Sequence, residues 1–179
     1  MQILPAQPAD AEPAAILLYS AYTHVQITFP LREEPAGSFI GHLERYFAQA
    51  GNRFSYQVTE VAEVDGAVAG VLLSFGGRDE ERLNDAVGPW LQHEAHDDEW
   101  YIDALAVFSN WARQGVGTQL LARAEELARA HGYPRIALNV AEDNTAARHL
   151  YERVGYAVTE HTTLYERPFV RMVKTLALL

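Results

Sequence analysis

The sequence predicts an α/β (α+β) fold, in which helices flank a mixed central sheet. Residues 101–107 and 135–140 have the apolar character of buried strands, and residues 117–131 between them have the periodicity of an amphipathic helix. A strand–helix–strand unit of this spacing requires a parallel strand pair. Earlier in the chain, β-rich segments at 54–64 and 67–75 flank an Asp-Gly pair, which favours an antiparallel hairpin.

The elements before residue 101 follow from local patterns. Apolar residues at i, i+1, i+4 and i+8 indicate a helix at about 38–50, and the Gly-Asn pair after it ends the helix. The polar stretch 76–99 has the least clear secondary-structure pattern of the chain. In order, we expect a strand at Ile3 and Leu4, a helix from Asp10 through Tyr22, a loop at 23–35, the helix at 38–50, the hairpin, and a short helix at about 80–87.

The elements after the first strand of the parallel pair have clearer boundaries. Gly132 and Pro134 end the helix at 117–131. Asn144 is a suitable N-cap for a short helix at 144–153, because its side chain can accept a hydrogen bond from a free backbone N–H. Residues 156–160 and 169–174 are expected to form the last strands, so that about four helices flank the sheet.

Length and composition indicate one domain over residues 1–179. The chain is 49% hydrophobic and 21% charged, which is enough apolar material for one core. Its 14 basic and 24 acidic residues give a net charge of −10, which disfavours nucleic acid and anionic lipid and is compatible with a cationic or amine partner. The absence of cysteine excludes a disulfide scaffold, a thiol nucleophile and thiolate metal sites.

The sequence also argues against membrane insertion and secretion. No apolar run approaches the roughly 18 residues that a transmembrane helix needs. The first ten residues contain two prolines and no basic residue, unlike a signal peptide. We therefore expect a soluble, cytoplasmic protein that binds neither membrane nor nucleic acid.

The sharpest local feature is the segment 112–118, Ala-Arg-Gln-Gly-Val-Gly-Thr, between a strand and a long helix. Glycine lets a ligand approach the backbone, and the free N–H groups that begin a helix attract anions such as phosphate. A Walker A loop is excluded because no lysine follows, and a dinucleotide fingerprint would need glycine where Leu120 stands. A structural turn with a helix cap and a pyrophosphate cradle of another kind both remain open.

A second motif supports the cradle. Residues 144–156 read Asn-Thr-Ala-Ala-Arg-His-Leu-Tyr-Glu-Arg-Val-Gly-Tyr. Together with the glycine loop, this segment resembles the GNAT superfamily of acyl-CoA-dependent N-acetyltransferases. The family loop is Gln/Arg-x-x-Gly-x-Gly/Ala, which matches at Gly115 and Gly117 but has Ala112 at its first position. The later family motif, Asn-x-x-Ala-x-x-Leu-Tyr-x-x-x-Gly-Phe/Tyr, matches throughout, and the resemblance covers about residues 101–156.

The resemblance implies how acetyl-CoA would bind. The parallel strands would splay apart, and the pantetheine arm would pair with the exposed backbone of the first of them. The loop N–H groups would hold the pyrophosphate, with Arg113 as an added charged contact, and Asn144 would contact the arm, cap the helix, or do both. The implied cofactor-binding residues are Leu105, Ala106, Val107, Arg113, Gln114, Gly115, Val116, Gly117, Thr118, Asn144 and Ala147.

The resemblance also implies catalytic roles. A backbone N–H near Ala106 or Val107 would stabilise the oxyanion, and Tyr151 would protonate the departing thiolate as general acid. On periodicity alone, Tyr151 could equally belong to the apolar core. Asp103 and Glu99 lie on the same face of the strand and are the candidate general bases, although either could instead be solvated at the sheet end.

Other histidines and aromatics receive less specific predictions. The His-Glu-x-His run at 93–96 lacks the i, i+4 histidine spacing of a metalloprotease helix, so we expect a solvated loop and no metal. The acceptor pocket is expected from the loop at 23–35 and from residues 161–169. Its aromatic candidates, which could also be plain core, are Tyr22, His24, Phe29, Tyr165 and Phe169.

These features together predict an N-acetyltransferase that moves an acetyl group from acetyl-CoA directly to a primary amine on a small molecule, a protein N-terminus or a lysine. Without cysteine, a thioester relay on the enzyme is excluded. Two alternatives stay open: a non-catalytic acyl-CoA-binding sensor or partner domain on the same fold, and transfer of a longer acyl group. A homodimer is compatible with the family, and residues 76–99 could form a lid or an oligomer contact.

Overall fold

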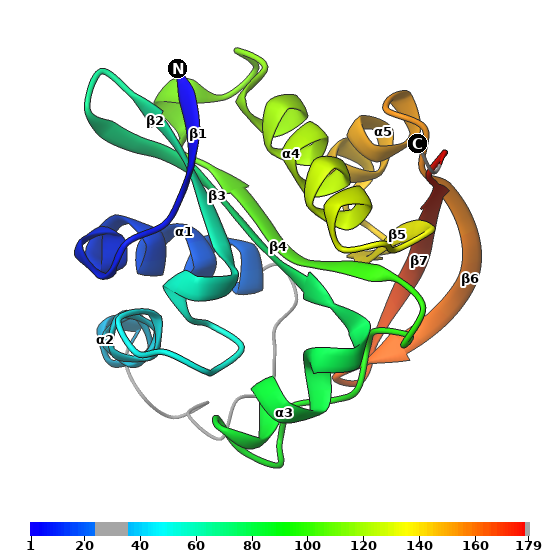
Figure 1. Ribbon diagram of the computed structural model, residues 1–179, viewed down its shortest axis with the longest axis horizontal. Coiled ribbons are helices and arrows are strands. Elements are labelled where there is room, and N and C mark those ends of the chain that lie inside the picture. The colour runs from blue at the N-terminus through cyan, green and yellow to red at the C-terminus, as the bar shows by residue number, and fades with distance from the viewer. Residues whose placement is uncertain (24–35, 178–179) are drawn as a thin grey trace.

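The computed structural model describes residues 1–23 and 36–177 and contains one seven-stranded sheet (Figure 1). The strand order is β1-β2-β3-β4-β5-β7-β6, and every neighbouring pair is antiparallel except β4–β5. The strands are β1 (Gln2–Pro5), β2 (Thr59–Val64), β3 (Ala67–Gly76), β4 (Trp100–Val107), β5 (Arg135–Ala141), β6 (Ala157–Leu164) and β7 (Arg167–Thr175). The mixed sheet predicted from the sequence is confirmed.

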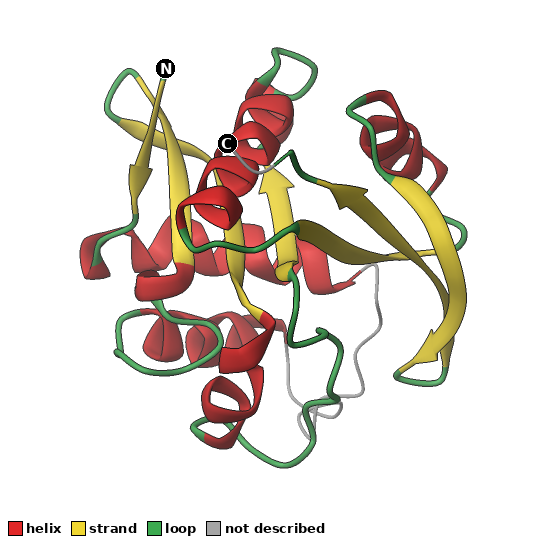
Figure 2. Cartoon of the chain, turned by 45° about the vertical axis from the view of Figure 1, so that its right-hand side comes forward, coloured by secondary structure: helices red, strands yellow, loops and turns green. Residues whose placement is uncertain are grey.

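Helices cover both faces of the sheet (Figures 1 and 2). The pair α1 (Ala11–Thr23) and α2 (Ala36–Phe47) packs on one face, and α4 (Val116–Ala130) and α5 (Thr145–Arg153) pack on the other. A short helix, α3 (Glu80–Asp85), follows β3. The described part therefore holds five helices, and α3 corresponds to the short helix expected at about 80–87.

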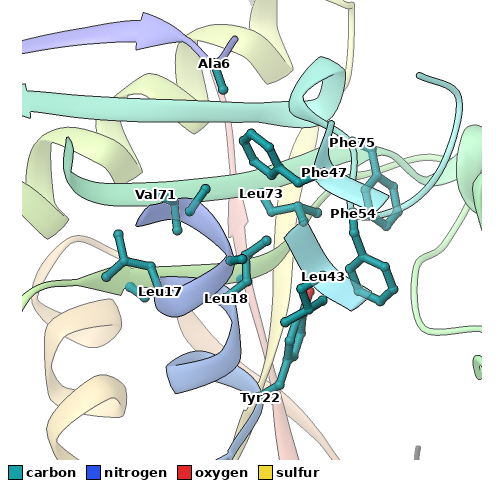
Figure 3. Packing of buried hydrophobic residues seen from close by; sticks show 14 of the residues in the cluster. Ala6, Leu17, Leu18, Tyr22, Leu43, Phe47, Phe54, Val71, Leu73 and Phe75 are labelled. Carbon is teal, nitrogen blue, oxygen red and sulfur yellow. The ribbon is translucent and has the colours of Figure 1, made fainter. Parts of the chain in front are cut away.

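The core is divided by the sheet into two layers. On one side, Leu17 and Leu18 of α1 meet Phe47 of α2 and Leu73 of β3, as Figure 3 shows. On the other side, the apolar face of α4 is buried against the sheet, with Leu120 and four similar residues at 3% exposure or less: Val116, Leu121, Ala124 and Ala128. The predicted amphipathic helix at 117–131 is thus confirmed to within one residue at each end.

The parallel strands separate soon after they meet. β4 and β5 pair only where Trp100–Ile102 lie beside Ile136–Leu138. The register between β3 and β4 then shifts, because Leu73 faces Ala104 while Ser74 faces Ile102, which leaves Asp103 as a bulge. Beyond it, β4 continues along β3 and β5 continues along β7, so the predicted splayed pair is present.

Several predicted boundaries were wrong. The first hairpin strand begins at Thr59 and not at 54, because residues 54–58 form a turn and one short 3₁₀ helix. The last two strands, predicted at 156–160 and 169–174, form a longer hairpin joined at Tyr165 and Glu166, both with positive φ (Figure 2). Most of the predicted loop at 23–35 lies outside the described residues. None of the helices in the described ranges is long and apolar enough to cross a bilayer.

Candidate active site

The N-terminus of α4 opens onto a groove that faces α5. The groove has a volume of about 570 Å³. It is lined by Val107, Trp111, Ala112, Arg113, Gly115, Val116, Gly117, Thr118, Ala146, His149, Leu150 and Arg153. Most of the predicted glycine loop therefore borders one concave surface.

The two loop glycines serve different purposes. Gly115 directly precedes the helix with a φ of 84°, a left-handed conformation that other residues rarely adopt. A Cβ atom added to Gly117 would lie 3.6 Å from Leu150 Cδ2, which is an ordinary contact, so protein packing does not require glycine there. Its missing side chain leaves the backbone open to a ligand in the groove.

The groove is suited to an anion. The N–H groups of Val116, Gly117 and Thr118 have no acceptor within the helix, since the ladder begins with the 3.0 Å bond from Gln119 N–H to Gly115 O. The helix dipole adds positive potential at the same end. Arg113 and Arg153 bring two cationic side chains to the groove wall. Backbone donors and two guanidinium groups together match the requirements of a phosphate.

Sequence reasoning gave Gln114 a backbone N–H contact with the pyrophosphate, and it missed side chains of α5. Gln114 is not among the described residues that line the groove, and its side chain donates to Asn110 O at 2.9 Å. His149 and Arg153 line the groove from α5 and were not predicted. Their i, i+4 spacing, which places both on one helix face, was the available signal.

The splay between the strands leaves one edge of β4 open. Leu105, Ala106 and Val107 pair with β3 on one side, and on the β5 side no strand pairs with them in the described part of the chain. Backbone groups at such an edge can pair with an extended ligand. At the neighbouring end of α5, Asn144 Oδ1 accepts a 3.2 Å bond from Ala147 N–H, so Asn144 is the N-cap.

A second cavity of about 130 Å³ occupies the gap between β4 and β5. Asn144, Ala147 and Tyr151 approach it from α5, and an acidic and aromatic wall lies across from them. The remaining lining residues are Ala21, Tyr22, Glu94, Tyr101, Asp103, Ala104, Leu105, Asn139, Val140, Ala141, Leu164, Tyr165 and Phe169. The cavity thus joins residues from both faces of the sheet.

Tyr151 is a phenol held in its neutral form. Its side chain lines the cavity, and only 9% of the residue is exposed. Burial raises the pKa of Tyr151 to about 12, and no charged neighbour contributes to that shift. The hydroxyl therefore keeps its proton throughout the neutral range and can act only as a donor to a developing anion.

The opposite wall is supported by a buried cluster of charges centred on Arg53, which is 1% exposed. Its guanidinium contacts three carboxylates, at 3.1 Å for Glu80, 3.1 Å for Glu94 and 2.6 Å for Asp103. Burial acts to lower the pKa of Arg53, but Asp103 and Glu94 outweigh it and raise that pKa above its ordinary value. One guanidinium thus faces three carboxyl groups, and the imidazole of His93 also contacts Glu80 at 2.8 Å.

Glu94 and Asp103 both line the cavity, and the pKa of Glu94 is raised above its ordinary value. Burial raises the pKa of Glu94 and Asp103 adds to the rise, whereas Arg53 opposes it. Two phenols donate to the carboxylate, Tyr101 at 2.6 Å and Tyr165 at 3.1 Å. The segment is held in place because Glu80 accepts bonds from the N–H groups of Glu94 (2.8 Å) and Ala95 (3.0 Å).

The two predicted bases have different locations. Asp103 lines the cavity, but its oxygens are occupied by Arg53 at 2.6 Å and by the Tyr22 hydroxyl at 2.6 Å. Glu99 is 1% exposed, pairs with Arg171 and does not line the cavity formed by the described residues. The structure therefore brings Asp103, but not Glu99, to the same cavity as Tyr151.

Sequence reasoning missed the cluster itself. The run 93–96 was expected to be solvated, and the side chains of His93 and His96 are indeed 65% and 55% exposed. The Glu94 side chain between them is only 9% exposed, so the expectation was wrong for this residue. No local pattern marks Arg53, because its three acidic partners are 27 to 50 residues away in sequence. The partners of Glu94 are 7 to 71 residues away, and no helix or strand repeat relates them to it.

Three of the five residues expected at the acceptor pocket line this cavity. Tyr22, Tyr165 and Phe169 line the cavity, as a pocket formed by these segments would require. His24 and Phe29 lie outside the described residues. The same side chains are buried in the structure, so they contribute to packing and to the cavity wall together.

Comparisons with known proteins agree with this architecture. A model of the acetyltransferase (GNAT) family matches residues 18–156. A mycothiol acetyltransferase from Jonesia denitrificans is 37% identical over 79 residues, which cover 44% of this chain and 25% of that protein. The aligned segments span 25% to 42% of the length of three curated relatives.

Two solved structures match nearly the whole chain, each with a TM-score of 0.82. One is a crystal structure of an acetyltransferase, 26% identical, which covers 99% of this chain and 100% of that chain. The other is an N-acetyltransferase from Staphylococcus aureus Mu50, 27% identical, which covers 97% of this chain and 100% of that chain.

Proposed function

Because the chain belongs to the acetyltransferase (GNAT) family, we propose that it transfers an acetyl group from acetyl-CoA directly to a primary amine. The acceptor amine is carried by a small molecule, a protein N-terminus or a lysine. The observation that carries this proposal is the cavity at the strand splay. There, a neutral phenol from α5 faces an acidic wall from the other side of the sheet, next to an anion-binding groove.

The groove and the open strand edge account for the binding of acetyl-CoA. The pyrophosphate accepts hydrogen bonds from the free N–H groups at the start of α4, and Arg113 and Arg153 add charge. The pantetheine arm pairs with the backbone of Leu105, Ala106 and Val107, beside Asn144 and Ala147. This arrangement brings the thioester to the cavity that Tyr151 lines.

The chemistry needs a proton acceptor, an oxyanion donor and a proton donor. An ammonium acceptor first gives one proton to a carboxylate of the cavity wall, and the neutral nitrogen then bonds to the thioester carbon. A backbone N–H near Ala106 or Val107 stabilises the oxyanion. The C–S bond breaks and the thiolate takes the Tyr151 proton. The new amide nitrogen loses its second proton, which restores Tyr151, and the carboxylate releases its own proton to solvent.

The proton donor Tyr151 and the carboxylate of the cavity wall fit this sequence of steps. A thiol has an ordinary pKa of roughly 8.5, below that of Tyr151, but a thiolate formed in the same buried site is also raised in pKa by desolvation. Hydrogen-bond donation from Tyr151 therefore stabilises the leaving group as its charge develops. Among the predicted bases, Asp103 is favoured over Glu99 because it lines the cavity.

The variant Tyr151→Phe tests this proposal. We expect kcat to fall by about 10²- to 10⁴-fold, the usual contribution of a positioned acid, while the Kd for acetyl-CoA stays unchanged. Thiol release measures turnover, and calorimetry measures binding. The control is Tyr156→Phe. Tyr156 is a buried tyrosine that follows α5, and it is not among the described residues that line the cavity. Wild-type kcat in Tyr151→Phe across the pH range would refute the assignment.

A further inference from the structure

One acceptor atom beside the cavity has no hydrogen-bond partner among the described residues. Asn139 of β5 lines the cavity, and its Nδ2 donates to the Tyr101 hydroxyl at 3.1 Å. Its Oδ1 is buried and bonds to nothing within residues 1–23 and 36–177. A buried, unbonded acceptor is costly, so its persistence at a cavity wall suggests that it serves a ligand.

The orientation of the Asn139 amide follows from its neighbours. The Tyr101 hydroxyl gives its single proton to Glu94 at 2.6 Å, so it can only accept from Asn139. Rotating the amide would place Oδ1 against a hydroxyl that has no proton left to donate. Nδ2 therefore faces Tyr101, and Oδ1 is the atom left for another donor.

The group that satisfies Oδ1 must be a donor, and the charges nearby favour a cation. Glu94 shares the Tyr101 hydroxyl with Asn139 and lines the same cavity. Behind Glu94, one guanidinium faces three carboxylates. The charged and titratable groups packed around Glu94 are Arg53, Glu80, Asp103, Tyr101, Tyr165 and, through the Glu94 carbonyl, Arg171.

We propose that the acceptor's ammonium group sits between Asn139 Oδ1 and the Glu94 carboxylate, which makes Asn139 a specificity-determining residue for cationic primary amines. This inference rests on the proposed acetyl transfer and assigns a residue that recognises the acceptor. A primary ammonium has three N–H donors, so it can bond to both acceptors and still point its nitrogen toward the thioester. An alcohol of the same shape has one donor and no charge, and it is rejected.

The first test is Asn139→Leu, which keeps the branched shape and the number of side-chain heavy atoms and removes both polar ends. With 2-phenylethylamine as the acceptor probe, we expect the amine KM to rise by about tenfold or more and the KM for acetyl-CoA to stay constant. The melting temperature should not fall, because the variant also removes an unsatisfied buried acceptor. 2-Phenylethanol should not be acetylated by either protein.

A matched control separates this role from a structural one. Asn52 is also buried, but its amide is satisfied, with bonds to Tyr46 O at 2.8 Å, to Gln49 O at 3.1 Å and from Phe54 N–H at 2.9 Å. Asn52→Leu should lower the melting temperature and leave the amine KM unchanged. If Asn139→Leu behaves in the same way, the inference is wrong.

A second variant covers the case in which Asn139→Leu does not fold. Asn139→Asp keeps an acceptor at Oδ1 and adds a negative charge, so we expect an amine KM equal to or below that of the wild type. An increase of tenfold would overturn the inference while the proposed transfer stands. If the wild type acetylates no amine, including 2-phenylethylamine, although it binds acetyl-CoA, the proposed function fails and this inference fails with it.

Discussion

Replacement of Arg53 by methionine tests whether the acidic wall depends on one buried cation. The variant has a similar volume but leaves Glu80, Glu94 and Asp103 without their shared counter-ion, and the side chains of all three are at most 9% exposed. Removal of one partner from a buried ion pair costs about 3–5 kcal/mol. For a chain of this size, that corresponds to a fall in melting temperature of roughly 6–20 °C at neutral pH.

The loss of stability in Arg53→Met should depend on pH, and the direction of that dependence can be worked out. Burial raises the pKa of Glu94 and Arg53 opposes that rise, so without Arg53 the pKa of Glu94 should rise further, and the folded variant then binds more protons than the unfolded chain. Stability of the variant therefore falls as pH rises through the raised pKa of Glu94, and the deficit shrinks as pH decreases toward about 5.

Thermal denaturation of both proteins between about pH 5 and pH 8 measures the effect. Arg82→Met is the matched control, because the Arg82 side chain is 63% exposed and its ion pair with Asp79 is a surface pair. We expect that control to change stability by less than about 1 kcal/mol. If Arg53→Met lowers stability by no more than the control does, and the loss of stability does not change with pH, the reasoning is refuted.

Two further predictions concern the two ends of α5. Asn144→Ala should lower the free energy of unfolding by about 1 kcal/mol in denaturant titrations, because it removes the N-cap of α5, whereas Asn144→Asp should keep the cap and the stability. A stability loss of the same size in Asn144→Asp would contradict the capping role. Arg153→Gln should weaken acetyl-CoA binding about two- to fivefold, a small effect because the side chain is exposed, and the difference should diminish at high salt. A Kd that is the same for both proteins at low salt would remove Arg153 from the phosphate site.

Local patterns predicted the parts of this molecule that local physics determines. The periodicity of α4 follows from one buried face, and the glycine loop was recognised because Gly115 and Gly117 stand directly at the start of that helix. The last hairpin was underestimated because most of β6 is exposed, so its residues lack the apolar alternation of a half-buried strand. Residues 54–58 were overestimated because apolar and β-branched side chains can also pack a turn.

The acidic wall could not be predicted because its residues meet only in the folded chain. Arg53 follows α2, Glu80 begins α3, Glu94 lies in an irregular segment and Asp103 forms a bulge in β4. Each is an ordinary polar residue in its local sequence. Asn139 was interpreted as part of an apolar strand, and only the three-dimensional network shows that its Oδ1 has no partner among the described residues.

The most direct test of the central claim is calorimetric titration of the purified protein with acetyl-CoA, followed by thiol release on the same sample with a series of primary amines. We expect binding in the micromolar range, abolished by Gly117→Glu, because that side chain would occupy the groove and bring a negative charge to the phosphate site. Gly41→Glu is the control, since a Cβ there meets nothing within 4 Å. Turnover with an amine would support the transferase, and no binding up to millimolar acetyl-CoA would contradict the account.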